Sequence, residues 1–232
     1  MVEYKPILEM RNIHKSFPGV KALDDVSVMI KPQEIVGLVG ENGAGKSTLM
    51  KILVGLHKPD TGSLHLKGEE ALFQGARDAI MHGIGMVFQE GCLIPNMTIE
   101  ENLFLGHEKK FKKSGLISPK GVREEAIDIL SQLNVAVDPK MYIRDVPAAC
   151  RQMIEVCRLL WLSQLYDIDN PILILDEPTT VLLEDEIDTL FSNLRELKRR
   201  ASIIFISHRL EEVKDISDRI IVFKDGKLMD EF

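Results

Sequence analysis

The sequence has few of the features that mark membrane, secreted or metal-stapled proteins. It contains only three cysteines, Cys92, Cys150 and Cys157. An odd count without close metal-ligand pairing argues against a disulfide framework and predicts reduced thiols in the cytoplasm. No apolar run approaches the roughly 20 residues that span a bilayer. The first residues also lack the basic and apolar regions of a signal peptide. Any work at a membrane is therefore expected to pass through a partner.

An excess of positive charge is missing as well. The formal net charge is −7, which argues against a general nucleic-acid surface, so no nucleic-acid partner is expected. The remaining composition, 45% hydrophobic and 28% charged, is typical of an ordinary globular protein. A chain of 232 residues is long enough for one large domain, and we expect residues 1–232 to form a single unit.

Short apolar runs alternate with helical patterns, which predicts an α/β fold with a mostly parallel sheet. Four nearly unbroken apolar runs are expected as strands buried on both faces, over residues 35–39, 84–88, 172–175 and 203–206. Two amphipathic segments, 7–13 and 26–30, are expected to form antiparallel strands. Near the end of the chain, residues 220–228 predict a hairpin with Asp225 and Gly226 at its turn.

The middle of the chain, from Thr98 to about residue 162, has helical patterns and no convincing strand. Thr98 and Glu101 form a capping box, Ser118 and Pro119 begin a second helix, and a third is expected over residues 147–162. We therefore predict a helical subdomain over residues 90–162, inserted in an α/β core made of residues 1–89 and 163–232. A later amphipathic helix, over residues 184–200, has an acidic start and a basic end that suit the helix dipole.

A glycine-rich stretch after the first buried strand matches the full phosphate-binding loop pattern. Glycines let the backbone curl so that its N–H groups point at phosphate oxygens. Lys46 supplies a positive charge for the β- and γ-phosphates, and Ser47 offers a hydroxyl to magnesium. A buried strand before the loop and a helical pattern after it give the expected context. The pattern predicts a nucleotide site at Gly40, Glu41, Asn42, Gly43, Ala44, Gly45, Lys46, Ser47 and Thr48.

A second chemical signal is a buried strand that ends in two carboxylates. Asp176 would hold magnesium through water, and Glu177 would polarise the attacking water as a general base. A strand that ends in acids at a loop is common in proteins, so this interpretation depends on the phosphate loop.

Polar residues follow all four predicted parallel strands. Gly40, Gln89, the pair Asp176 and Glu177, and His208 each come directly after, or one residue after, an apolar run. Parallel strands would bring these groups to one carboxyl edge, where open α/β sheets bind ligands. There Gln89 would contact magnesium and sense the γ-phosphate, and His208 would contact the γ-phosphate or orient the water. A lone Gln or His after a strand is otherwise an ordinary loop residue.

Phe17 precedes the phosphate loop, on the first β-segments. An aromatic ring at this place could stack on adenine. The alternative is a core residue.

Taken together and in this order, the motifs resemble those of ABC ATPases over essentially the whole chain. The segments 16–26, 152–156 and 206–213 resemble the N-terminal cassette of bacterial monosaccharide importers of the ribose and galactose type. This resemblance implies an ATPase that uses ATP and Mg²⁺ to power import of a small solute. It also implies that Phe17 stacks on adenine, that Gln89 is the glutamine coupled to the helical subdomain, and that His208 is the switch histidine.

The same resemblance implies several partners. Two cassettes sandwich ATP, so a second cassette is expected, as the C-terminal half of the same natural polypeptide beyond Phe232. Transmembrane permease subunits would bind the cassettes, and a solute-binding protein would act through the permease. The chain is then expected at the cytoplasmic face of the cell membrane.

One departure from the family pattern lies just before Arg151. The signature Leu-Ser-Gly-Gly-Gln is replaced by Val146, Pro147, Ala148, Ala149 and Cys150. In the family this loop opens a helix that faces the γ-phosphate held by the other cassette. Pro147 removes both the serine hydroxyl and its own N–H, although it also suits the first turn of a helix. Only one competent composite site is therefore expected. Leu183 is a second departure, because many ABC cassettes have Asp there.

Three alternatives remain beside the importer. A soluble ABC ATPase of translation or DNA repair is disfavoured by the acidic charge and the importer-like segments. An ATP-binding module without turnover is disfavoured by Glu177 and His208 but favoured by the poor signature. A small-molecule P-loop kinase would need an acceptor pocket, and the sequence offers no residues for one.

Overall fold

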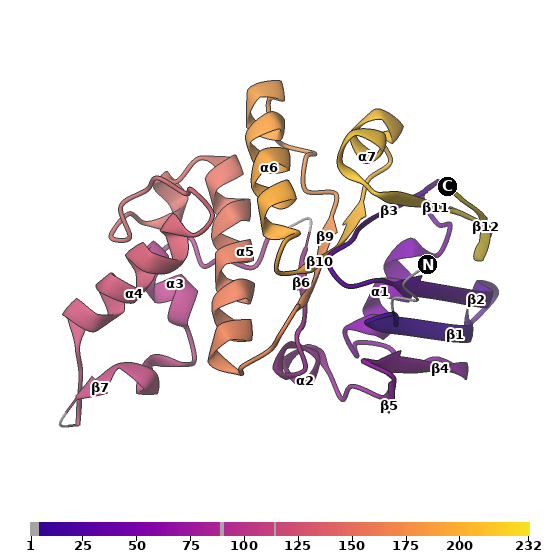
Figure 1. Ribbon diagram of the computed structural model, residues 1–232, viewed down its shortest axis with the longest axis horizontal. Coiled ribbons are helices and arrows are strands. Elements are labelled where there is room, and N and C mark those ends of the chain that lie inside the picture. Colours follow the sequence, from indigo (N-terminus) through magenta and orange to yellow (C-terminus); the bar gives the residue numbers. More distant parts are fainter. Residues whose placement is uncertain (1–4, 89–90, 114) are drawn as a thin grey trace.

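Two sheets and a group of helices make up the computed structural model, which describes residues 5–88, 91–113 and 115–232 (Figure 1). A six-stranded sheet lies in the middle. A four-stranded antiparallel sheet lies on one side of it, and a helical group lies on the opposite side. This arrangement is an α/β fold with an antiparallel β-subdomain, as the sequence predicts.

The central sheet has the strand order β12-β11-β3-β10-β9-β6. All neighbours are parallel except β11 and β12, which form the predicted hairpin around Asp225 and Gly226. The predicted buried strands are confirmed with small changes of boundary. The strands are β3 (Ile35–Gly40), β6 (Ile84–Val87), β9 (Ile172–Asp176), β10 (Ser202–Ile206), β11 (Arg219–Lys224) and β12 (Lys227–Glu231).

The smaller sheet has the order β2-β1-β4-β5 and is antiparallel throughout. Its first two strands, β1 (Leu8–Phe17) and β2 (Val20–Ile30), confirm the antiparallel prediction, and both are longer than the predicted segments. The strands β4 (Thr61–Leu66) and β5 (Glu69–Ala71) are not among the strands predicted from the sequence. One helix, α1 (Lys46–Leu53), packs Leu49 and Leu53 into a core shared with both sheets.

Three helices form the helical group: α3 (Ile99–Phe104), α4 (Pro119–Ser131) and α5 (Ala148–Leu165). Thr98 caps α3 through the predicted capping box with Glu101, and Ser118 caps α4. Two short 3₁₀ turns, η1 (Glu108–Phe111) and η2 (Ile143–Asp145), connect them. The helical group therefore begins where its capping residues predict.

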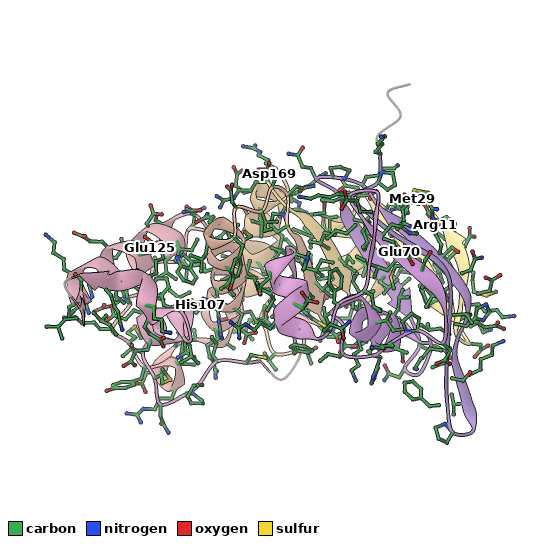
Figure 2. The ribbon with its side chains drawn as sticks, turned by 90° about the horizontal axis from the view of Figure 1, so that it is seen from below. Arg11, Met29, Glu70, His107, Glu125 and Asp169 are labelled. Carbon is green, nitrogen blue, oxygen red and sulfur yellow. The ribbon has the colours of Figure 1, made fainter. Side chains whose placement is uncertain are left out.

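An aromatic core holds this group together. The ring of Trp161 lies 4.7 Å from that of Phe104, and its Nε1 donates a hydrogen bond of 2.8 Å to Glu125. Figure 2 shows Glu125 and His107 on this side of the molecule, far from Arg11 and Met29 of the antiparallel sheet. The aromatic residues belong to one hydrophobic core that continues from the helical group into the central sheet.

The expectation that this middle region contains no strand is wrong. Two-residue strands, β7 (Lys112–Lys113) and β8 (Leu116–Ile117), pair as a small hairpin before α4. A two-residue strand is too short to show an alternating apolar pattern, and β7 consists of two lysines, which do not indicate a strand.

Three further helices complete the described fold: α2 (Ala76–Met81), α6 (Glu184–Leu197) and α7 (Leu210–Ile216). The predicted apolar stripe of α6 is buried at Leu190, Leu194 and Leu197. Within the described ranges, we find no helix with the length and apolar character needed to cross a bilayer.

Candidate functional site

The phosphate-binding loop connects the end of β3 to the start of α1. All three of its glycines have positive φ, 156° at Gly40, 84° at Gly43 and 105° at Gly45, and the first and last are also crowded. A Cβ would lie 2.3 Å from the carbonyl oxygen of Phe223 at the first position, and 2.6 Å from that of Ala22 at the last. Only glycine fits these turns, so the sequence pattern reflects a backbone shape as well as ligand chemistry.

Lys46 is folded back against its own loop. The residue is 7% exposed, and its ammonium donates hydrogen bonds to the carbonyl oxygens of Gly40, at 2.6 Å, and Glu41, at 3.0 Å. Burial lowers the pKa of Lys46, while the carboxylates of Glu177 and Asp176 oppose that shift. The cation therefore lies between the loop and the acidic strand end.

The rest of the loop presents polar groups to solvent. Asn42, Gly43 and Ser47 are exposed, and Thr48 is half-buried at the start of α1. The N-cap of α1 is Gly45, and within the described part of the chain no side chain caps this helix. The first N–H groups of the helix are thus left for another acceptor, such as a phosphate oxygen.

The carboxyl edge of the central sheet brings most of the predicted site together. In register, Asp176 of β9 lies opposite Ile206 of β10, and the N–H of Glu177 donates to the carbonyl of Ile206 at 2.9 Å. His208 follows β10, and its Nδ1 lies 3.0 Å from Oε1 of Glu177. The two predicted catalytic side chains therefore form a hydrogen-bonded pair. Gln89 lies outside the described residues.

Asp176 is half-buried, and both Glu177 and Lys46 lie close enough to act on its charge. Burial raises the pKa of its carboxyl, the negative charge of Glu177 raises it further, and Lys46 acts in the opposite direction. Among the described residues, none donates a hydrogen bond to this carboxylate. A cation at this edge would relieve the repulsion between the two acids.

The oxygen donors at this edge fit magnesium. Within the described part of the chain, no group of three or more His, Cys, Asp or Glu side chains is arranged to hold a metal ion. A magnesium ion bound with a nucleotide needs only one or two protein oxygens, because phosphates and water supply the others. The exposed hydroxyl of Ser47 and the carboxylate of Asp176 are donors of this type.

The backbone at Glu177 is strained. Its φ of 48° lies in the left-handed region, which is unfavourable for a residue with a Cβ. Two hydrogen bonds hold this backbone in place. The N–H of Glu177 donates to the carbonyl oxygen of Ile206, and the carbonyl oxygen of Glu177 accepts a hydrogen bond of 3.0 Å from the hydroxyl of Thr180. Strain of this kind concentrates where a side chain must be aimed for function.

The strain at Glu177 predicts an inverted glycine effect. We expect Glu177→Gly to be more stable than Glu177→Ala by about 1 kcal/mol, because only glycine is relaxed at this φ. At Asp188, exposed within α6, the same pair should give the usual order, with alanine more stable by roughly 0.5–1 kcal/mol. Urea unfolding of the four nucleotide-free variants measures both differences. An alanine variant as stable as the glycine variant at residue 177 would contradict the strain.

Phe17 lies at the end of β1 and is 38% exposed, so it is not a core residue. Its ring meets that of His57 edge to face, at 5.4 Å between centroids, and Lys15 lies 5.6 Å from the ring centre. An exposed ring with one fixed edge contact leaves surface on which a flat base could stack. Its assignment to adenine remains a prediction.

The segment 146–150, predicted to be a degenerate signature, lies at the start of α5. Val146 is buried, Pro147 is exposed at the N-cap, and the helix begins at Ala148. Pro147 thus precedes the first turn instead of occupying it. Pro147 makes no capping hydrogen bond to any of the residues that the structure describes. Burial raises the pKa of the Cys150 thiol, and the carboxylate of Glu186 raises it further, so the thiol stays neutral beside a negative charge.

Glu155 is a buried acidic residue that is not among the site residues predicted from the sequence. The residue is 8% exposed within α5, and its carboxylate accepts a hydrogen bond of 2.8 Å from the N–H of Cys92. Burial raises its pKa, and the N–H groups of Cys92 and Leu93 oppose the shift. Glu155 therefore ties the segment after β6 to the helical group. Its signal in the sequence was a lone acid between the apolar residues Ile154 and Val156.

Comparison with known proteins agrees with this geometry. The family model described as "ABC transporter" matches residues 23–180. A putative ribose/galactose/methyl galactoside import ATP-binding protein of Halalkalibacterium halodurans is 42% identical over 95% of this chain and 41% of its own length. The ribose import ATP-binding protein RbsA 2 of Burkholderia cenocepacia is 46% identical over 95% of this chain and 42% of its own length. The chain thus spans less than half the length of these relatives.

A solved structure gives the same result for the fold. The crystal structure of a nucleotide-free ATP-binding cassette from an ABC transporter superposes with a TM-score of 0.84 and 26% identity. The match covers 98% of this chain and 91% of that cassette. The family model covers most of the chain, and the relatives are more than 40% identical over 95% of it. This protein therefore belongs to the ABC transporter family.

Proposed function

We propose that this chain is an ATP-binding and ATP-hydrolysing cassette that powers import of a small solute. The observation that carries the proposal is the shared edge of β3, β9 and β10. There Lys46, Asp176 and the Glu177–His208 pair meet the phosphate loop. Phosphate binding and water activation require these groups to lie together.

In the proposed reaction, the loop backbone and Lys46 bind the phosphates, and Phe17 stacks on adenine. Glu177 accepts a proton from the water that attacks the γ-phosphate, while His208 holds the carboxylate in place and contacts the γ-phosphate. Ser47 and Asp176, with Gln89, would hold a magnesium ion. Bound with ATP, that ion would neutralise charge on the β- and γ-phosphates.

A monosaccharide is the solute we favour. The relatives that match nearly the whole chain are named for ribose and galactose import. Permease subunits, and through them a solute-binding protein, would then be the partners at the cytoplasmic face of the membrane. The cassette itself has no role in choosing the sugar, since the solute contacts those partners.

We further propose that one competent ATP site forms between this phosphate loop and the intact signature of a second cassette. The relatives are about twice as long as this chain, which leaves room for a second cassette in one polypeptide. The reciprocal site, built on the helix start at Pro147, would be slow or silent. An ATP-binding module with little turnover is the second candidate, and the same degenerate helix start favours it.

The Lys46→Ala variant tests the central proposal. We expect its affinity for Mg-ATP to fall about ten- to a hundredfold, because a hydrogen bond to a charged group contributes about 1.5–3 kcal/mol. Lys51→Ala is the matched control, since Lys51 is an exposed lysine on the same helix. Titration calorimetry measures both affinities. Equal affinity of the Lys46 variant and the wild type would remove the proposed nucleotide site.

A further inference from the structure

A single carboxylate on α7 joins the two loops that carry the catalytic pair. The side chain of Glu212 is only 12% exposed. Its Oε2 accepts hydrogen bonds from the hydroxyl of Thr179, at 2.5 Å, and from that of Ser207, at 3.2 Å. Its other oxygen, Oε1, accepts a hydrogen bond of 2.9 Å from Arg209. Both oxygens are therefore occupied by donors from the surrounding loops.

These donors flank the catalytic side chains in sequence. Thr179 comes two residues after Glu177, and Ser207 immediately precedes His208. Thr179 and Ser207 are each 2% exposed, so water does not replace the bonds that they make. The hydroxyl of Ser207 also accepts a hydrogen bond of 3.0 Å from the N–H of Arg209, on the far side of His208. Glu212 thus contacts the side chain of Thr179, which follows Glu177, and the side chains of Ser207 and Arg209 on either side of His208.

The helix that carries Glu212 is itself held firmly. Val213 and Ile216 of α7 are buried against the central sheet. A Cβ at Gly37 of β3 would lie 2.2 Å from Cγ1 of Val213, so the helix packs closely on the strand that leads to the phosphate loop. Packing of α7 against the core therefore fixes the position of Glu212. Glu212 in turn holds the loop after β9 and the loop after β10 through its hydrogen bonds.

We infer that Glu212 is a positioning residue for ATP hydrolysis, because it holds the Glu177 and His208 loops in register with one another. The inference rests on the proposed function, in which Glu177 and His208 act on water. Glu177 sits in a strained conformation and His208 is half-exposed, so the relative placement of the two side chains depends on the loops that carry them. Because a carboxylate bound by three donors is rigid, it supplies that support.

The test removes the hydrogen bonds without removing the catalytic groups. In Glu212→Gln an amide N–H₂ replaces one acceptor oxygen. In Thr179→Val a methyl group replaces the hydroxyl at nearly constant shape. We expect each variant to lower kcat roughly ten- to a hundredfold, as small misplacements of reacting groups do, with KM for ATP unchanged. The double variant should be no slower than the slower single variant, because both changes break the same contact.

Two controls separate positioning from general damage. Thr179→Ser keeps the hydroxyl and should retain wild-type turnover. Glu211→Gln changes the neighbouring acid, whose side chain is 88% exposed, and should have no effect. Phosphate release is measured on the assembled transporter, with circular dichroism to verify folding. If Glu212→Gln does not fold, comparing the kcat of Thr179→Val with that of Thr179→Ser still tests whether the hydrogen bond to Glu212 is needed for turnover.

A Glu177→Gln variant, measured in parallel, distinguishes a failure of the positioning role of Glu212 from a failure of the catalytic role of Glu177. If it loses turnover while Glu212→Gln and Thr179→Val retain theirs, the positioning inference is wrong and the proposed function stands. If it retains turnover, another group is the base, and the positioning inference fails together with the catalytic role proposed for Glu177. A rise in KM without a fall in kcat in the Glu212 and Thr179 variants would also overturn positioning, because it would assign these residues to ATP binding.

Discussion

Glu177→Gln should bind ATP as tightly as the wild type and lose nearly all turnover in the assembled transporter. The amide keeps the size of the side chain and can still accept a hydrogen bond from His208. It cannot take a proton from water, and general-base catalysis contributes about 10²–10⁴-fold. Removing the charge also relieves the repulsion that raises the pKa of Asp176, so nucleotide binding has no reason to weaken.

Phosphate release and calorimetry, measured on the same preparations, separate binding from chemistry. His208→Ala is expected to follow the same pattern, since its ring lies 3.0 Å from the carboxylate that it orients. The change Glu184→Gln, which also removes one negative charge, lies at the exposed start of α6; it is the matched control and should leave turnover unchanged. Unchanged phosphate release from Glu177→Gln would mean that another group is the base.

Much of this site was predictable because the residues proposed to bind phosphate and activate water lie in short contiguous motifs. The phosphate loop needs glycine at fixed positions for backbone reasons, which the close approach of Gly40 to Phe223 illustrates. The shared edge was predictable from four buried strands alone, because parallel strands place their carboxyl ends together. Asp176, Glu177 and His208 then followed from their position one or two residues after a strand.

Other features could not be read in the same way, because they depend on contacts between distant segments. Glu212 reaches Thr179 across 33 residues, and Glu155 reaches Cys92 across 63. A single acid in an amphipathic helix looks like a solvated residue until its partners are known. The strand β4 was missed because its burial pattern has one fully buried residue, Leu64, and therefore gives no clear alternation.

The asymmetry of the proposed ATP sites gives the second prediction, which concerns dimers of this chain. A homodimer would place the start of α5 against the γ-phosphate in both sites. There Pro147 has no hydroxyl or N–H, and Ala149 brings a Cβ toward the phosphate. The charge of Glu186 beside Cys150 adds repulsion. We therefore expect the isolated chain to remain monomeric with ATP and to hydrolyse it slowly.

Repairing the signature should reverse this. We propose Pro147→Ser, Ala148→Gly, Ala149→Gly and Cys150→Gln in a Glu177→Gln background, which keeps ATP intact. One restored hydrogen bond to a charged phosphate contributes about 1.5–3 kcal/mol, and two sites double that. The dimer should then tighten by about 10²–10⁴-fold in Mg-ATP, measured by analytical ultracentrifugation.

A matched variant shows which part of the repair matters. This variant has Pro147→Ala in place of Pro147→Ser and keeps the other three changes. It restores the N–H of residue 147 and the two glycines but not the hydroxyl. Its dimer should be intermediate, because the hydroxyl is one of the lost donors. An unrepaired Glu177→Gln chain that already dimerises tightly with ATP would show that this helix start binds phosphate without the signature. The proposed asymmetry between the two ATP sites would then be wrong.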